Sequence, residues 1–195
     1  MSKPALFIFL HGVGDNAAGM QGLANVFRHQ FPDAHYYVPN GTMPFGMGTG
    51  RQWFSIEGVT EENRTARVAE KVPALIADIK RVQAEKGVAP ENIVLVGFSQ
   101  GSIMSLAAVA VEDGLVGHVL AFSGRYASLP AEAPKQTRLH FFHGEADPVM
   151  PVQLAYAAVE HLGKLGGTAT LDTTPGLGHN ISQDLLSKAI AYLQE

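Results

Sequence analysis

Residues 93–101 read Ile-Val-Leu-Val-Gly-Phe-Ser-Gln-Gly, and this stretch decides the fold. Its first four residues are apolar and predict a buried strand, and the small apolar residues that follow it predict a helix. Gly97-x-Ser99-x-Gly101 fits the tight turn that joins such a strand to such a helix. The residues two before and two after the serine must be tiny because strand and helix converge there.

The same turn suggests a chemical role for its serine. A strand-to-helix turn this tight holds Ser99 in strained backbone geometry with its hydroxyl pushed into the open. The next amide, Gln100 N–H, lies at the start of the helix and points to where an oxyanion would form. The bare glycine–serine–glycine pattern is weak evidence, so the strand before it and the helix after it carry the interpretation.

Similar apolar runs and helical patterns alternate along the whole chain. Strands are predicted at residues 5–11, 35–39, 118–122, 138–143 and 168–173, in addition to the one before Ser99. Apolar stripes predict helices over 20–27, 68–82, 154–165 and 182–193, with Gly87 as a C-cap and Ser182 as an N-cap. Pro73 predicts either a kink in the second helix or a new start there. Alternating buried strands and helices indicate an α/β fold with a mostly parallel sheet and helices on both faces.

Length and composition limit the classes of protein. The 195 residues suit one domain, which we predict to span residues 1–195. The net charge is −4 with both signs scattered, so no basic stripe indicates a nucleic-acid partner or a stable membrane association. There are no cysteines, which excludes disulfides and thiolate metal sites. The chain shows no leader segment and no apolar run long enough to span a bilayer, which predicts a cytoplasmic location.

Two more strand ends carry residues that complete a catalytic pattern with Ser99. Asp147 follows the strand at 138–143, and His179 follows the strand at 168–173. Ligands of parallel sheets bind where loops leave the carboxyl ends of strands, and the order Ser–Asp–His is that of a known hydrolase arrangement. Alone, Asp147 before Pro148 could bond its own loop, and His179 could be a surface histidine. Together with Ser99, they predict a nucleophile, an orienting acid and a base.

The other histidines fit this pattern less well. His140 and His143 lie three apart on one predicted strand, so they face opposite sides of the sheet and cannot share a metal ion. No metal site is predicted. His11 leaves the first strand at the correct edge of the sheet, and we interpret it as a structural residue that braces its loop by hydrogen bonds. A catalytic role for His11 is the alternative.

The loop after the first strand allows two interpretations. Gly12-x-Gly14-x-x-Ala17 matches a dinucleotide-binding fingerprint. A dinucleotide site also requires an acidic residue at the end of the next strand, which instead ends in Val-Pro-Asn-Gly. The favoured interpretation uses Val13 N–H as a second oxyanion donor, with Gly12 and Gly14 allowing it to point inward. No cofactor is predicted.

Four ordered segments resemble one known family. LHGVGDN, GFSQG, HGEADPVMP and GLGHNIS resemble segments of the phospholipase/carboxylesterase family, which belongs to the α/β-hydrolase fold. The resemblance implies Ser99 as nucleophile, Asp147 and His179 as its partners, and Val13 and Gln100 as oxyanion amides. Gly97 and Gly101 shape the turn. The stretches RQWFS and GRYASLP are most similar to a branch of small bacterial esterases.

The chain departs from the family pattern in two respects. It begins almost directly with the strand at 5–11, so a sheet of about six or seven strands is expected, and it has no room for a cap domain. The pocket must then be closed by loops, chiefly residues 41–54. There Met43, Trp53 and Phe54, with Phe45 and Met47, could form an apolar wall, and Met150 is a further predicted substrate contact. The alternative is that these loop residues only fill the edge of the core.

The expected function follows from this set of residues. The resemblance implies a serine carboxylesterase that hydrolyses short-chain acyl or aryl esters, with thioesters as further candidates, through an acyl-enzyme. Its partner is a small-molecule ester. The alternative is a catalytically silent protein of the same fold that binds a small hydrophobic ligand. Monomer and homodimer both stay open, and the sequence does not define the acyl-chain length.

Overall fold

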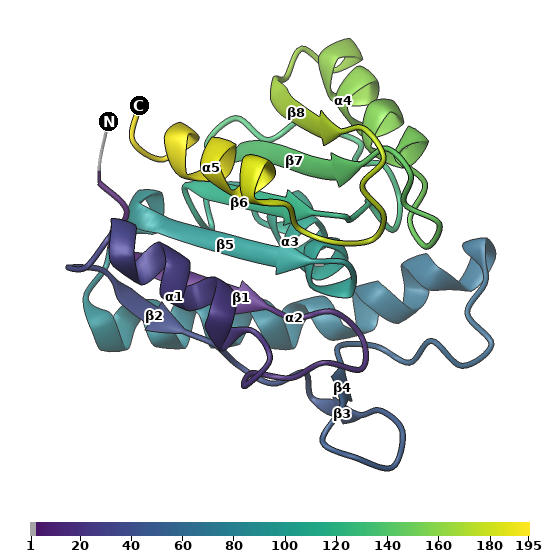
Figure 1. Cartoon of the computed structure of the whole chain (residues 1–195), viewed down its shortest axis with the longest axis horizontal. Coiled ribbons are helices and arrows are strands. Elements are labelled where there is room, and N and C mark those ends of the chain that lie inside the picture. The colour runs from purple at the N-terminus through teal and green to yellow at the C-terminus, as the bar shows by residue number, and fades with distance from the viewer. Residues whose placement is uncertain (1–2) are drawn as a thin grey trace.

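Six parallel strands form the central sheet of the protein (Figure 1). A computed structural model describes residues 3–195, so residues 1 and 2 of the predicted domain lie outside the described part. The strand order is β2-β1-β5-β6-β7-β8, and every neighbouring pair is parallel. The strands are β1 Leu6–Leu10, β2 His35–Tyr37, β5 Ile93–Phe98, β6 His118–Phe122, β7 Arg138–Gly144 and β8 Ala169–Thr174. All six predicted strands are confirmed, with ends that differ by at most two residues.

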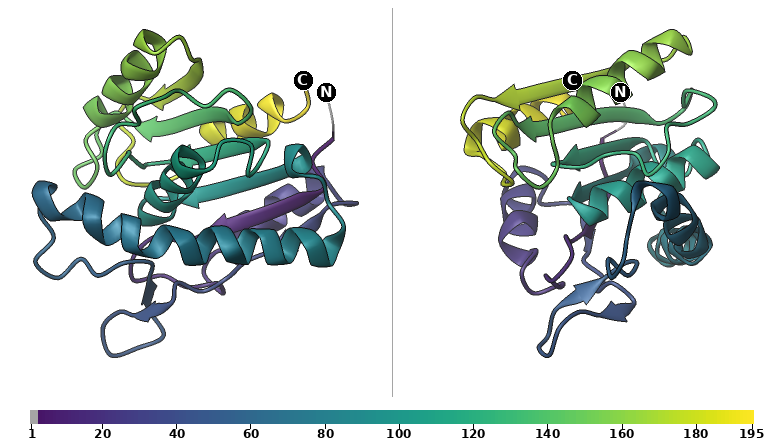
Figure 2. Two further views of the ribbon diagram at one scale, coloured as in Figure 1. Left: turned by 180° about the vertical axis from the view of Figure 1, so that it is seen from behind. Right: turned by 90° about the vertical axis from the view of Figure 1, so that its right-hand side faces the viewer.

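Helices cover both faces of the sheet, as predicted (Figure 2). One face carries α1 Gln21–Gln30 and α5 Gln183–Tyr192, and the other carries α2 Glu61–Lys86, α3 Gln100–Val111 and α4 Gln153–Lys164. The side chains of β1 alternate between the two layers. Phe7 and Phe9 pack with α1 and α5, whereas Leu6, Ile8 and Leu10 pack with the helices of the opposite face. This alternation is the period of two that a fully buried strand requires.

Helix α2 is longer than its apolar stripe predicts. It begins after Thr60, whose hydroxyl accepts a hydrogen bond from the backbone N–H of Asn63 in a capping box. It continues through Pro73 and ends at Gly87, which adopts φ = 63° as the predicted C-cap. The helix therefore does not start afresh at Pro73. Its polar first two turns carry no apolar stripe because none of their residues is buried in the core, and two of them, Glu61 and Arg64, line the cavity described below.

Residues 41–54 form a hairpin in place of the predicted pocket loop. Strands β3 Met43–Pro44 and β4 Arg51–Gln52 pair in antiparallel fashion and project away from the sheet (Figure 1). Met47 lies fully exposed in the hairpin's turn. The Arg51 guanidinium closes the base of the hairpin by donating to Gly41 O at 2.9 Å. The Arg51 carbonyl accepts from Gly14 N–H at 2.8 Å, which ties the hairpin to the loop after β1. The short 3-10 helix η1 Pro90–Asn92 leads into β5.

Two histidines form a buried pair near the opposite, amino-terminal edge of the sheet. His118 Nδ1 lies 3.2 Å from His140 Nε2, and His140 Nδ1 lies 2.9 Å from Thr170 Oγ1. The His140 ring also stacks on Tyr192 of α5. Burial lowers the pKa of both His118 and His140 to about 4. Both rings are therefore neutral in the folded protein at neutral pH.

The histidine pair predicts that acid destabilises the fold. The His140 pKa is 6.5 in the unfolded chain and about 4 in the folded chain. Between these two pH values the unfolded chain binds more protons than the folded chain, so the free energy of unfolding falls as the pH is lowered through this range. We expect His140→Gln to lessen this slope by about 1 kcal/mol per pH unit. Urea unfolding at several pH values measures it, with His29→Gln on α1 as the exposed control. Equal slopes in wild type and His140→Gln would contradict the prediction.

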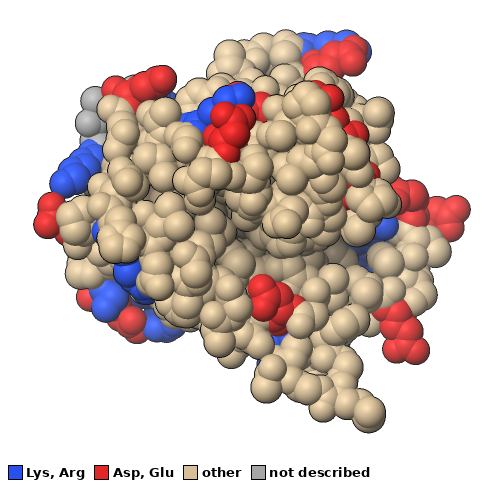
Figure 3. Space-filling view, in the orientation of Figure 1, with Lys and Arg blue, Asp and Glu red and all other residues tan. Residues whose placement is uncertain are grey.

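The charged side chains lie mostly around the margin of the face seen in Figure 1. Acidic and basic residues are interspersed there, and no continuous basic stripe crosses this face (Figure 3).

Among the helices of residues 3–195, none combines the length and the apolar character needed to cross a bilayer.

Candidate active site

The turn between β5 and α3 holds Ser99 in the strained conformation that the sequence predicts. Ser99 has φ = 52° and is almost fully buried, at 6% exposure. A Cβ atom at Gly97 would lie 2.6 Å from Ser102 Cα, and one at Gly101 would lie 1.9 Å from Leu10 O. Both distances are shorter than real Cβ contacts. The two glycines are therefore required by the close approach of strand and helix.

Ser99, His179 and Asp147 form one chain of hydrogen bonds. His179 Nε2 lies 3.0 Å from Ser99 Oγ, and His179 Nδ1 lies 2.7 Å from Asp147 Oδ2. The three residues come from the loops that follow β5, β7 and β8, at the carboxyl edge of the sheet. The ring of Phe98 packs against the His179 imidazole with 5.0 Å between centroids. The structure therefore brings together the three residues that the sequence singles out.

The Asp147 carboxylate divides its two oxygens between two tasks. Oδ1 accepts hydrogen bonds from the backbone N–H groups of Val149 and Met150, at 2.9 and 2.8 Å, and Oδ2 faces His179. Burial alone would raise the pKa of this carboxyl, but the hydrogen bonds from Met150, His179 and Val149 outweigh it and lower the pKa. Asp147 is thus both a loop aspartate and the partner of His179, the two roles that the sequence left as alternatives.

A second histidine supports the Asp147 loop. The His143 side chain is fully buried, with Nε2 2.7 Å from Met150 O and 3.5 Å from Asp147 Oδ2. Burial lowers the pKa of His143, so the neutral ring donates to Met150 O. In the sequence, His143 serves only to exclude a metal site. Its position four residues before Asp147, at the end of a strand, was the available signal for this contact.

Two backbone amides near Ser99 have no acceptor within residues 3–195. Gln100 is the first residue of α3, so its N–H has no partner inside the helix. Val13 lies between Gly12 and Gly14, and its N–H donates to no described group, whereas Gly14 N–H donates to Arg51 O at 2.8 Å. Val13 and Gln100 line the same cavity as Ser99. This arrangement matches the oxyanion interpretation of the glycine-rich loop.

His11 connects two loops at the edge of the site. The ring is fully buried, with Nδ1 2.6 Å from Gly12 O and with Nε2 accepting from Gly41 N–H at 2.8 Å. Burial lowers the pKa of His11. The His11 carbonyl accepts the indole N–H of Trp53 at 2.9 Å. The ring and carbonyl of His11 thus bond to backbone groups and to the Trp53 indole, as expected of a residue that braces its loop.

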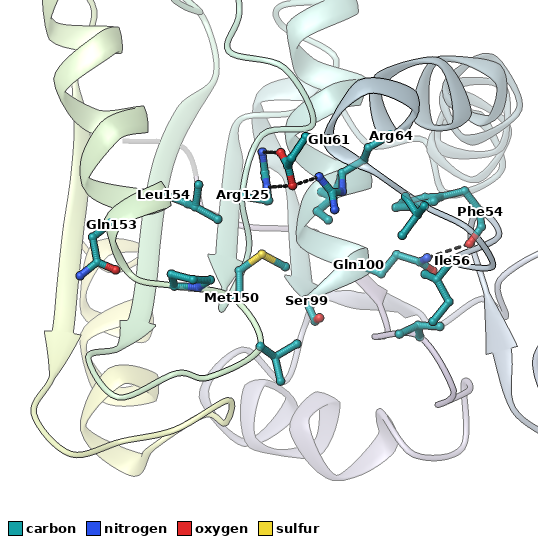
Figure 4. Close-up of a pocket in the computed structure, with 15 residues that line it drawn as sticks. Phe54, Ile56, Glu61, Arg64, Ser99, Gln100, Arg125, Met150, Gln153 and Leu154 are labelled. Atoms are coloured by element: carbon teal, nitrogen blue, oxygen red, sulfur yellow. Dashed lines mark hydrogen bonds and ion pairs between the residues drawn. The ribbon is translucent and has the colours of Figure 1, made fainter.

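The Gln100 side chain ties the end of the hairpin to the turn at Ser99. Its Oε1 accepts from Trp53 N–H at 2.6 Å. Its Nε2 donates to Phe54 O at 2.8 Å, a bond drawn in Figure 4. These two bonds fix where residues 53 and 54 lie relative to the turn at Ser99. From the sequence, only a role of the Gln100 backbone N–H is predicted, and this side-chain role is missed.

A cavity of about 570 Å³ opens beside Ser99 (Figure 4). Of the four predicted substrate contacts, Phe54 and Met150 line it, and Met43 and Trp53 do not. Of the predicted wall of residues 41–54, only Phe54 therefore lines this cavity, because Met43, Phe45 and Met47 lie on the projecting hairpin and Trp53 is buried in the core. Trp53 is held by its bond to the His11 carbonyl and lines a separate cavity. The remaining walls come from four segments: Ile56, Val59, Glu61 and Arg64; Ile103; Arg125; and Val149, Pro151, Gln153 and Leu154.

Comparison with known proteins identifies the family. The model of the family described as Phospholipase/Carboxylesterase matches residues 2–195. The chain belongs to this family. It is 44% identical to esterase YpfH of Escherichia coli strain K12 over 194 residues, which cover 98% of this chain and 84% of that protein. Acyl-protein thioesterase 1 of Gibberella zeae is 28% identical over 98% of this chain and 90% of its own.

Solved structures of similar proteins share the fold. The crystal structure of esterase PE8 superposes with a TM-score of 0.89 at 32% identity, covering 99% of this chain and 93% of that chain. The crystal structure of Arabidopsis thaliana SOBER1 gives 0.81 at 26% identity, over 98% of each chain. The protein has the α/β-hydrolase fold of these neighbours, with six strands in its central sheet and no cap domain within residues 3–195. Membership in this family makes it a serine hydrolase of carboxylic esters.

One cluster of charged residues in the cavity was not predicted. Arg125 donates to both carboxylate oxygens of Glu61, at 3.0 and 2.8 Å, and Arg64 donates to Glu61 Oε1 as well. The hydrogen bonds from Arg125 and Arg64 lower the pKa of Glu61. Arg125 belongs to the GRYASLP stretch by which the chain resembles small bacterial esterases of the family. No local pattern links Arg125 to Glu61, which lies 64 residues earlier in the chain.

Within residues 3–195, no group of three or more histidine, aspartate or glutamate side chains is arranged to hold a metal ion.

Proposed function

We propose that this family member is a carboxylesterase that cleaves short-chain acyl or aryl esters, with thioesters as a second substrate type, through Ser99. The observation that carries the proposal is the continuous hydrogen-bonded chain from Asp147 through His179 to Ser99 Oγ, beside the cavity. A serine hydroxyl becomes a nucleophile when an adjacent base, itself oriented by a third group, accepts its proton. The esterases and thioesterases among its relatives support the same reaction class.

Each residue has a defined task in the proposed mechanism. Ionised Asp147 accepts from His179 Nδ1–H and thereby selects the tautomer whose Nε2 is free to accept the Ser99 proton. Ser99 Oγ attacks the ester carbonyl, and the bond to the leaving oxygen or sulfur breaks as His179 returns the proton to it. Water, activated by His179, then hydrolyses the acyl-enzyme and releases the acid.

The oxyanion of each tetrahedral intermediate lies between two amides in this proposal. Val13 N–H and Gln100 N–H have no other acceptor in the described chain, so both are free to donate to the developing charge. Such a donor typically contributes about 3–4 kcal/mol of transition-state stabilisation. Gly12, Gly97 and Gly101 are assigned structural roles that hold the two loops close together, and His11 is assigned the bracing role.

The substrate fits a cavity of limited size in this proposal. A volume of about 570 Å³ with walls from Phe54, Met150 and Ile103 suits a short acyl or aryl group. Phe54 and Met150 are assigned as substrate contacts. Met43 and Trp53 are not, because neither lines the cavity.

A fluorophosphonate tests the proposal directly. We expect one label per chain, on Ser99, because phosphonylation needs an activated hydroxyl. Ser123 is an internal control, since it is also buried with positive φ, yet its hydroxyl has no partner in residues 3–195. Peptide mass spectrometry locates the label, and hydrolysis of p-nitrophenyl esters from acetate to octanoate sizes the cavity. Absence of both labelling and turnover in the folded protein would instead favour the silent ligand-binding alternative.

A further inference from the structure

The charged side chains of the cavity are arranged asymmetrically. Glu61, Arg64 and Arg125 are the charged residues among those that line it, so the lining carries two positive charges and one negative charge. The cavity is therefore positive by one charge, in a chain whose net charge is −4. In Figure 4 the three side chains lie across the cavity from Ser99.

The glutamate lies outside and the arginines lie inside. The Glu61 side chain is 68% exposed, whereas those of Arg64 and Arg125 are 17% and 15% exposed. Glu61 therefore binds the guanidinium groups from the solvent side. Its carboxylate offsets one of the two positive charges. Both arginine side chains still line the cavity on their other side.

Arg64 has most of its hydrogen-bonding capacity unused. A guanidinium carries five N–H donors. Arg64 directs one of them to Glu61 and none of the others to an acceptor within residues 3–195. Arg125, in contrast, is held at three points, by Glu61 Oε1, by Glu61 Oε2 and by the Tyr126 carbonyl. Arg125 is thus held in place by its three hydrogen bonds. Arg64, at the same end of the cavity, keeps N–H groups available to donate to a bound molecule.

From this arrangement we propose that the preferred ester carries a free carboxylate at the end remote from the scissile bond, and that Arg64 binds this carboxylate. The inference rests on the proposed function, since it names the substrate class of the same site. A guanidinium matches the two oxygens of a carboxylate in plane, and the single excess charge of the lining matches a monoanion. Substrates of this class are half-esters of dicarboxylic acids. The apolar walls between the cluster and Ser99 contact the methylene chain.

The experiment compares half-esters with neutral analogues of the same shape. Monomethyl esters of the dicarboxylic acids from succinate to suberate are hydrolysed beside the analogues in which the free carboxylate is a primary amide. We expect a kcat/KM ratio of about tenfold or more in favour of the carboxylate at the chain length that spans the cavity. Arg64→Gln should reduce that ratio to near one. Arg81→Gln removes the same charge from the exposed face of the same helix and should leave the ratio unchanged.

The outcomes separate this inference from the proposed function. If Ser99 is labelled and the amide esters are cleaved, yet no chain length favours the carboxylate, the inference is wrong and the esterase proposal stands. The inference is also wrong if Arg64→Gln keeps the ratio of the wild type, or if Arg81→Gln loses it. Failure of Ser99 to be labelled, together with no cleavage of either series, would overturn both.

Discussion

Replacing Ser99 by alanine is expected to lower kcat for p-nitrophenyl butyrate by about five to six orders of magnitude. The change removes a single oxygen atom, the one that lies 3.0 Å from His179 Nε2. Without it no acyl-enzyme forms, and only the oxyanion amides and the binding cavity still act on the ester. The thermal midpoint should stay close to that of the wild type, since alanine meets the same positive φ that the serine already adopts.

The control for this prediction is Ser123→Ala. It removes the same atom from another buried residue with positive φ at the end of a neighbouring strand, and it should retain full activity. Activity above a hundredth of the wild type in purified Ser99→Ala would mean that another residue is the nucleophile. A lower thermal midpoint in Ser99→Ala alone would instead point to a structural loss, so both quantities are measured on the same samples.

The second large effect is on stability. Gly101→Ala is expected to lower the free energy of unfolding by about 4 kcal/mol or more, enough to prevent folding of a marginal domain. The added Cβ would lie 1.9 Å from Leu10 O and 2.5 Å from Leu10 C, both backbone atoms of the central strand β1. Neither β1 nor α3 can shift easily, because β1 is paired on both sides and α3 packs on the sheet.

A glycine without neighbours provides the matched control. A Cβ at Gly163 in helix α4 meets nothing within 4 Å, so Gly163→Ala should raise stability by about 0.5 kcal/mol through helix propensity. Urea unfolding followed by circular dichroism measures both variants. If Gly101→Ala unfolds at the urea midpoint of the wild type, the convergence of strand and helix at this turn is looser than the structure indicates.

Most of the sheet could be predicted because its strands are buried on both faces. Such strands are continuous apolar runs, and a run like that of residues 93–96 is recognisable without knowledge of its neighbours. The start of α2 could not be predicted in this way. Its cap is the pair Thr60 and Asn63, two polar residues in a polar segment, and no apolar stripe marks the first two turns.

The candidate site also contains a part that could be predicted and a part that could not. Ser99, Asp147 and His179 could be found because each follows a recognisable strand, and the ends of parallel strands meet at one edge. The cavity walls could not, because residues 53 and 54 are placed by the Gln100 side chain across 46 or 47 positions of sequence. The pairing of Glu61 with Arg125 is equally remote. Both depend on side-chain hydrogen bonds between segments that have no regular spacing.

The hydrogen bonds through Gln100, Trp53 and His11 have a consequence for local unfolding. They link the turn at Ser99 to the end of the hairpin, and they link the hairpin end and Gly41 to His11, the residue that follows β1. No one of these loops can open without leaving buried polar groups of another unpaired, which is costly. The loops around Ser99 therefore form a single cooperative unit, whose amides exchange together at one free energy of opening. The proposed oxyanion amides and the cavity wall at Phe54 are then preserved or lost together.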